Sequence, residues 1–132
     1  MYFGFGLGDS DEIVKFYPPA NNNHVSHSVI YNNKTADMSI DVKLLRLHTI
    51  LDKLDNNDID ILKMAIEGAE YRVIYDIIKS NIPIGQILIE FHHRFNYPMI
   101  KKTKNSIKKL NECGYTVFNI SDSGEEYSFI KV

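Results

Sequence analysis

The chain has 132 residues, which is enough for one domain with a hydrophobic core and too few for two. Its 44% hydrophobic and 24% charged content is that of a globular protein, with neither a long apolar span nor a leader-like start. Fifteen basic and seventeen acidic residues give a formal net charge of -2, so nothing in the total indicates a nucleic-acid or membrane partner. Cys113 is the only cysteine, and we therefore expect a soluble protein of the reducing cytoplasm.

The first part of the chain is predicted to consist of strands joined by exposed loops. Apolar runs indicate strands over residues 2–7, 13–17 and 38–47. Pro18 and Pro19, followed by three asparagines, interrupt regular structure between the second and third of these strands. Thr49 is positioned to cap a short helix after the third strand.

The remainder of the chain alternates between strands and helices. The pattern predicts a strand at 59–66, a helix at 69–80, a strand at 86–92, a helix capped by Asn96 that stops at Gly114, and strands at 115–120 and 127–132. The strand at 59–66 is almost continuously apolar, which is typical of a strand buried in a parallel sheet. This order predicts an α/β fold with an open, mostly parallel sheet and an antiparallel edge strand. Ligands bind such sheets at the carboxyl ends of the strands, here just after Ile66 and Ile89.

The segment at the end of strand 59–66 carries the most informative motif. Lys63, Glu67, Gly68 and Glu70 form the pattern Lys-x-x-x-Glu-Gly-x-Glu after Ile-Asp-Ile-Leu. This pattern resembles the strand-to-helix signature of FkbM-family methyltransferases, Lys-x-Asp-x-Glu-Gly-x-Glu. These enzymes use S-adenosylmethionine.

Flanking segments extend the resemblance over about residues 40–120. Upstream, Leu-His-Thr-Ile-Leu starting at Leu47 is similar to a strand that runs into a short leucine-rich helix in the family. Downstream, the strand ending Glu90-x-His92 and the segment Gly-Tyr-x-Val-Phe starting at Gly114 are similar to later family blocks. The resemblance implies a Rossmann-like class I methyltransferase sheet, with residues 1–132 forming a single partial domain whose N-terminal part is incomplete.

The sequence departs from the family pattern in two ways. Ala65 stands where the family has an aspartate, which removes a carboxylate from the place where cofactor and acceptor meet. The family's opening strand and Gly-rich cofactor loop have no counterpart here. Gly4-Phe5-Gly6-Leu7-Gly8 invites comparison with such a loop, but a strand should precede that loop and a long helix should follow it. We expect a strand with close backbone packing instead, and by resemblance Gly8 and Asp9 lie near the adenine of the cofactor.

The candidate acceptor-side residues are Glu67, Glu90 and His92. Glu90 and His92 are two apart on a strand and so point to one face, whereas His93 points to the other. Methyl transfer to a hydroxyl needs a base, a role that His92 or a carboxylate can fill. The alternatives are structural, because Glu67 and Glu70 could stabilise the start of a helix and His92 could be a hydrogen-bonded core residue. Lys63 is expected to pair with Glu90 on the neighbouring strand.

Two functions follow from these features. By resemblance, the chain would transfer a methyl group from S-adenosylmethionine to a hydroxyl oxygen of a small molecule or sugar, and no metal is expected. Alternatively, it is a truncated, inactive domain that serves binding or assembly, which Ala65 and the absent loop favour. An exposed apolar sheet edge would also predict a homo-oligomer.

Overall fold

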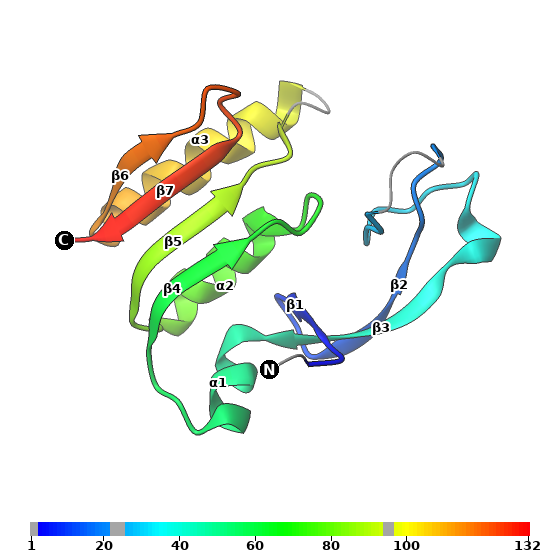
Figure 1. Ribbon diagram of the computed structural model, residues 1–132, viewed down its shortest axis with the longest axis horizontal. Helices are drawn as coiled ribbons and strands as arrows, with labels where there is room; N and C mark the ends of the chain where they lie inside the picture. Colours follow the sequence, from blue (N-terminus) through cyan, green and yellow to red (C-terminus); the bar gives the residue numbers. More distant parts are fainter. Residues whose placement is uncertain (1–2, 22–25, 94–96) are drawn as a thin grey trace.

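The computed structural model describes residues 3–21, 26–93 and 97–132, which form an α/β structure with two mixed sheets and three α-helices (Figure 1). The α/β class predicted from the sequence is therefore confirmed. No helix in these ranges is both long and apolar enough to cross a membrane.

The smaller sheet is built from the N-terminal third of the chain. Its strands are β1 (Gly6–Gly8), β2 (Glu12–Phe16) and β3 (Ile40–Arg46), in the order β1-β3-β2. β1 pairs with β3 in parallel, and β2 pairs with β3 antiparallel. The short 3-10 helix η1 (Ala36–Met38) lies between β2 and β3 in the sequence. The three strands confirm the predicted elements, although β1 is shorter than predicted and Tyr2 lies outside the described residues.

Helix α1 (Leu47–Leu54) follows β3 directly, and its start is capped differently from the prediction. Thr49 lies inside the helix rather than at its N-cap, and its hydroxyl donates to Oδ2 of Asp11 at 2.7 Å. The other oxygen of Asp11 accepts the backbone N–H of Arg46, the N-cap residue, at 2.7 Å. A carboxylate from the turn between β1 and β2 thus supplies the acceptor at this helix start.

The larger sheet contains the rest of the chain. Its elements are β4 (Ile59–Met64), α2 (Glu70–Ser80), β5 (Ile84–Glu90), α3 (Tyr97–Glu112), β6 (Tyr115–Ile120) and β7 (Glu126–Lys131), with the strand order β4-β5-β7-β6. All of these elements were predicted, but Asn96, the predicted cap of α3, lies outside the described residues.

The predicted pairing of this sheet is confirmed for the parallel β4–β5 pair, but the position of the antiparallel strand differs from the prediction. Only β4 and β5 are parallel; β7 pairs antiparallel with both β5 and β6, so the described strands form a mixed sheet rather than a mostly parallel one. The predicted hairpin at the C-terminus is present, but β7 folds back between β5 and β6 instead of forming the edge. Tertiary packing decides on which side of β6 the returning strand lies, because a hairpin turn is compatible with either side.

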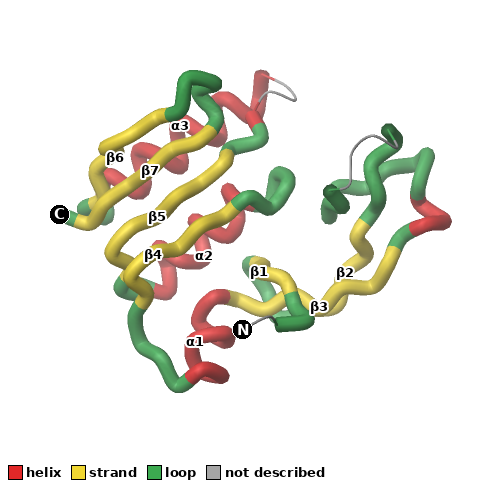
Figure 2. The backbone as a smooth tube through the Cα atoms, viewed as in Figure 1, coloured by secondary structure: helices red, strands yellow, loops and turns green. Residues whose placement is uncertain are grey.

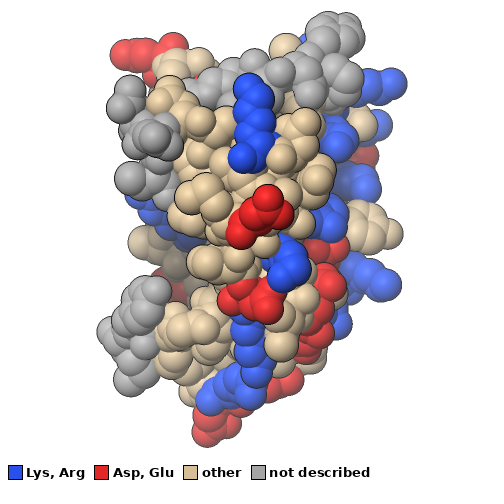
Figure 3. Space-filling model, turned by 90° about the vertical axis from the view of Figure 1, so that its right-hand side faces the viewer, with Lys and Arg blue, Asp and Glu red and all other residues tan. Residues whose placement is uncertain are grey.

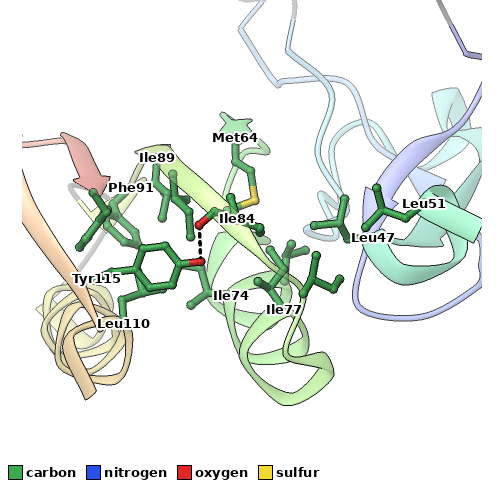
Figure 4. Packing of buried hydrophobic residues seen from close by; sticks show 14 residues of the cluster. Leu47, Leu51, Met64, Ile74, Ile77, Ile84, Ile89, Phe91, Leu110 and Tyr115 are labelled. Atoms are coloured by element: carbon green, nitrogen blue, oxygen red, sulfur yellow. Dashed lines mark hydrogen bonds between the residues drawn. The ribbon is translucent and has the colours of Figure 1, made fainter. Parts of the chain in front are cut away.

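The helices α2 and α3 lie on one face of this sheet (Figure 2), and the hydrophobic core lies between these helices and the sheet. Phe91, Leu110 and Phe129 are fully buried there, and the hydroxyl of Tyr115 donates to the carbonyl oxygen of Ile84 at 2.9 Å (Figure 4). No helix of the described residues covers the opposite face. The sequence predicted that β4 would be buried on both faces. This was wrong, because one face is uncovered and Ile61 is 56% exposed on it.

An ion pair joins the end of β3 to helix α2. Arg46 contacts Oδ1 of Asp76 at 2.7 Å and donates to the hydroxyl of Ser80 at 3.0 Å. Leu47 and Leu51 of α1 belong to the same buried cluster as the residues of the larger sheet. These contacts fix the smaller sheet beside the larger one.

Candidate active site

The turn between β4 and α2 has a backbone conformation that side chains rarely adopt. Glu67 has φ 53° and Gly68 has φ 98°, so both residues are left-handed. One carboxylate oxygen of Glu70 holds the turn by accepting the N–H groups of Ile66 at 3.1 Å and Gly68 at 3.2 Å. Glycine at position 68 permits this tight exit from the strand, because it adopts a positive φ without strain. A strained residue that carries a carboxylate, such as Glu67, is a feature typical of functional sites.

His92 lies among three carboxylates just beyond the end of β5. Its Nδ1 is 2.7 Å from Oε1 of Glu70, and its Nε2 is 3.5 Å from Oε2 of Glu67 and 3.9 Å from Oε1 of Glu90. The three predicted acceptor-side residues are thus brought together. His93 instead has its Nδ1 3.4 Å from the hydroxyl of Thr103 on α3, which agrees with its predicted direction away from this cluster.

The cluster favours a positive charge on His92. The hydrogen bond with Glu70 raises the pKa of His92 above its ordinary value of 6.5; burial opposes this, and the charges of Glu70, Glu67 and Glu90 add to the rise. Oε2 of Glu70 is buried and has no hydrogen-bond partner among the described residues, so one oxygen carries all the contacts of this carboxylate. Glu70 therefore stabilises the protonated form of His92 through this one oxygen.

Exposure separates the members of the cluster into a rim and an interior. The Glu67 and Glu90 side chains are 32% and 36% exposed, whereas His92 is 4% exposed and Glu70 is fully buried. Glu67 lines a cavity of about 630 Å³ next to the segment after β2, and Glu90 lines a smaller one of about 260 Å³ on the open face of the sheet. Incoming molecules therefore meet the two carboxylates, with the imidazole behind them.

The structure does not bring Gly8 and Asp9 into this cluster. Asp9 is 3.7 Å from Arg72 on α2 and lines a third cavity, of about 500 Å³, between α2 and α3. Gly8 is buried, and a Cβ atom there would lie 3.0 Å from the Cβ of Leu44. The absence of a side chain at Gly8 thus serves strand packing, as predicted for this segment.

Lys63 and Ala65 both lie on the open side of the sheet. Among the described residues Lys63 makes no ion pair, so the predicted pairing with Glu90 was wrong even though both residues line the 260 Å³ cavity. Lys63 does not need that pairing because β4 leaves it exposed to solvent. Ala65 is also exposed in the same cavity, so the carboxylate that the family has at this position is replaced by open space.

Two partners of the site were missed by sequence reasoning. Glu70 was expected to be a helix-start charge, but it is the buried residue that organises both the turn and His92. The signal was a second glutamate three residues after Glu67 and a histidine at the end of the next strand. Ser28 donates from its hydroxyl to the carbonyl oxygen of Glu67 at 3.0 Å, a contact across 39 residues that no local pattern could indicate.

The order of these elements and the Glu-Gly-x-Glu turn agree with a match to known protein families. The Methyltransferase FkbM domain matches residues 4–117, which is most of the chain. This chain belongs to the FkbM methyltransferase domain family. Comparisons with curated proteins and with solved structures gave no match.

The described residues of this FkbM-family chain do not complete a site for the family's cofactor. Asp9 is engaged by Arg72, the space at Gly8 is filled by Leu44, and Glu67 lines a different cavity from Asp9. No Gly-rich turn between a strand and a helix is present in the described ranges other than that of Gly68, whose N–H group already donates to the Glu70 carboxylate. Nor do these ranges hold a group of three or more side chains able to bind a metal ion.

Proposed function

We propose that the chain is the acceptor-binding part of an O-methyltransferase of FkbM type, with a hydroxyl of a small molecule or sugar as the methyl acceptor. The observation that carries this proposal is the placement of His92 between Glu70 and the two rim carboxylates. By family resemblance the methyl donor is S-adenosylmethionine. The described residues do not complete a site for this donor.

Glu67 and His92 share the base role in this proposal. Glu67 accepts the hydrogen bond of the acceptor hydroxyl, because it is the exposed member of the cluster and lines the larger cavity. A bound donor would supply the methyl group and leave as the demethylated thioether, and the contribution of this chain would be to take the hydroxyl proton onto Nε2 of His92, 3.5 Å from Glu67. Glu70, which is hydrogen-bonded to Nδ1, stabilises the resulting imidazolium and acts as a positioning residue.

The test is methyl transfer from radiolabelled S-adenosylmethionine to a panel of hydroxyl acceptors. Because the described residues do not complete a donor site, we expect donor affinity no tighter than about 1 mM, and the donor is used above that concentration. Glu67→Gln is expected to lower the rate by about 100-fold, the usual contribution of a general base. Glu112→Gln is the matched control, since Glu112 is an exposed carboxylate on α3 that pairs with Lys108 at 3.8 Å.

The pH profile separates a base from a residue that only supports the fold. His92 can take a proton only when it is neutral, and its pKa is raised, so the rate is expected to increase with pH with a midpoint above 6.5. Equal rates in Glu67→Gln and Glu112→Gln would overturn the assigned base. Donor binding by calorimetry without transfer to any acceptor would favour the second candidate function.

The second candidate is a non-catalytic assembly module that associates through β4. β4 is the edge strand of its sheet, and Ile61 is 56% exposed on it, which is an arrangement that promotes pairing between chains. Sedimentation analysis is expected to show a dimer that Ile61→Lys converts to a monomer. Ile120→Lys is the control, because Ile120 is 50% exposed on β6 at the opposite edge of the same sheet. A monomeric wild-type chain would contradict this candidate.

A further inference from the structure

The cavity beside Glu67 has a lining that differs from the rest of the candidate site. It has a volume of about 630 Å³, within the range of small-molecule sites, and most of its wall comes from the segment between β2 and β3. One contact holds this segment against the site, and a second closes the segment on itself. Ser28 donates to the carbonyl oxygen of Glu67 at 3.0 Å, and Thr35 donates from its hydroxyl to the carbonyl oxygen of Pro18 at 2.7 Å.

Aromatic and proline surfaces form the apolar part of the wall. The rings of Tyr17 and Tyr31 meet edge to face, with centroids 5.3 Å apart, next to Pro18 and Pro19. Tyr17 is also fixed by paired backbone hydrogen bonds with Ser28. Tyr31 is 67% exposed, so its ring is a supported but uncovered platform. Such a platform suits a ligand with a flat apolar face.

The polar part of the wall offers hydrogen bonds but little charge. Asn32 and Asn33 line the cavity, and Oδ1 of Asn32 accepts the N–H of Lys34 at 3.1 Å, which leaves its amide N–H groups to act as donors. Among the described lining residues there is no lysine, arginine or histidine, and Glu67 is the single carboxylate. A phosphorylated or acidic ligand would be repelled there without a compensating cation. A purely apolar ligand would leave the amides unpaired.

We propose that this cavity binds the uncharged pyranose ring of a glycoside, with the C–H face of the ring on Tyr31 and a ring hydroxyl directed at Glu67. The inference rests on the proposed function, because the hydroxyl that meets Glu67 is the methyl acceptor. It narrows the acceptor to one chemical class. Lysine and arginine side chains on the surface at this end of the molecule are interspersed with acidic ones, so neither sign dominates this face (Figure 3).

The experiment measures sugar binding in the absence of any methyl donor. Methyl glucoside, methyl galactoside and methyl mannoside are titrated into the 132-residue chain and followed by saturation-transfer NMR and calorimetry, with glucose 6-phosphate as the charged comparison. At least one methyl pyranoside is expected to bind at about millimolar strength, which is ordinary for a small neutral ligand. Tyr31→Ala is expected to weaken that binding about tenfold. Tyr75→Ala is the matched control, since Tyr75 is 55% exposed on α2 in a different cavity.

Each outcome decides between this inference and the proposed function. Binding that is lost in Tyr31→Ala but kept in Tyr75→Ala supports the inference. Absence of binding by all three pyranosides, or equal binding of glucose 6-phosphate, overturns it. Methyl transfer to a hydroxyl acceptor that is not a sugar, without pyranoside binding, would overturn the inference while leaving the proposed function intact. Urea unfolding of both variants shows whether each one is folded.

Discussion

The two sheets of the molecule differ in how they are buried and in what they contribute to the candidate site. The larger sheet packs on α2 and α3 around a shared core, and it supplies the buried pair of His92 and Glu70. The smaller sheet has no buried residue in β2, and the segment after β2 supplies the wall of the cavity beside Glu67. Rigid packing thus holds the buried pair, whereas an exposed segment lines the cavity.

The largest expected effect is a core truncation in the larger sheet. Phe129→Ala removes a fully buried ring and is expected to lower the free energy of unfolding by about 3–5 kcal/mol. Ile13→Ala, in the 72% exposed position of β2, is expected to change it by less than about 0.5 kcal/mol. Urea unfolding followed by circular dichroism measures both. Equal effects would mean that the two sheets share the core more evenly than their exposure indicates.

The next effect compares a buried with an exposed ion pair. Glu70→Gln keeps an oxygen that can accept the two turn N–H groups but leaves His92 without its charged partner. The expected loss is about 3 kcal/mol, the cost of removing one partner of a buried pair. Asp41→Asn removes the exposed pair with Lys15 in the smaller sheet and is expected to have little effect in the same unfolding assay. If Glu70→Gln were as stable as wild type, the ion pair between Glu70 and His92 would make no net contribution to the free energy of unfolding.

A smaller effect tests how closely the segment between β2 and β3 packs against the turn between β4 and α2. Gly68 and Gly124 both have positive φ, so an alanine at either position is expected to cost about 1–2 kcal/mol. At Gly68 the added Cβ also lies 3.0 Å from Cδ1 of Ile30, whereas at Gly124 nothing lies within 4 Å. Gly68→Ala is therefore expected to be the more destabilising of the two in thermal unfolding. Equal losses would mean that Ile30 moves aside without cost.

The most gradual effect is the pH dependence of stability. The pKa of His92 is raised in the folded state, so its contribution is fully present below the ordinary value of 6.5 and is lost as the pH rises through the folded value. The difference in unfolding free energy between wild type and Glu70→Gln should accordingly shrink with increasing pH. Urea unfolding at a series of pH values starting below 6.5 measures this. A difference that does not change with pH would indicate that His92 stays neutral in both proteins.

The sequence alone determined the element types and marked Glu67, Glu90 and His92 as candidate site residues. Apolar periodicity located every described strand and α-helix, because side-chain spacing of two or 3.6 residues is a local property. The Glu67-Gly68 turn and the Glu90-x-His92 strand end are also local patterns, so the residue order was sufficient to identify their side chains as candidates. The parallel ends of β4 and β5 then bring them to one edge of the sheet.

Tertiary structure decided what spacing cannot encode. The position of β7 between β5 and β6, and the exposure of β4, depend on which surfaces other elements cover. The burial of Glu70 against His92 depends on the distance between two turns 22 residues apart, and the contact of Ser28 with Glu67 joins two sheets. Burial and long-range contacts arise only when the whole chain folds. They decide whether Glu70 is a charge at a helix start or the partner of a histidine.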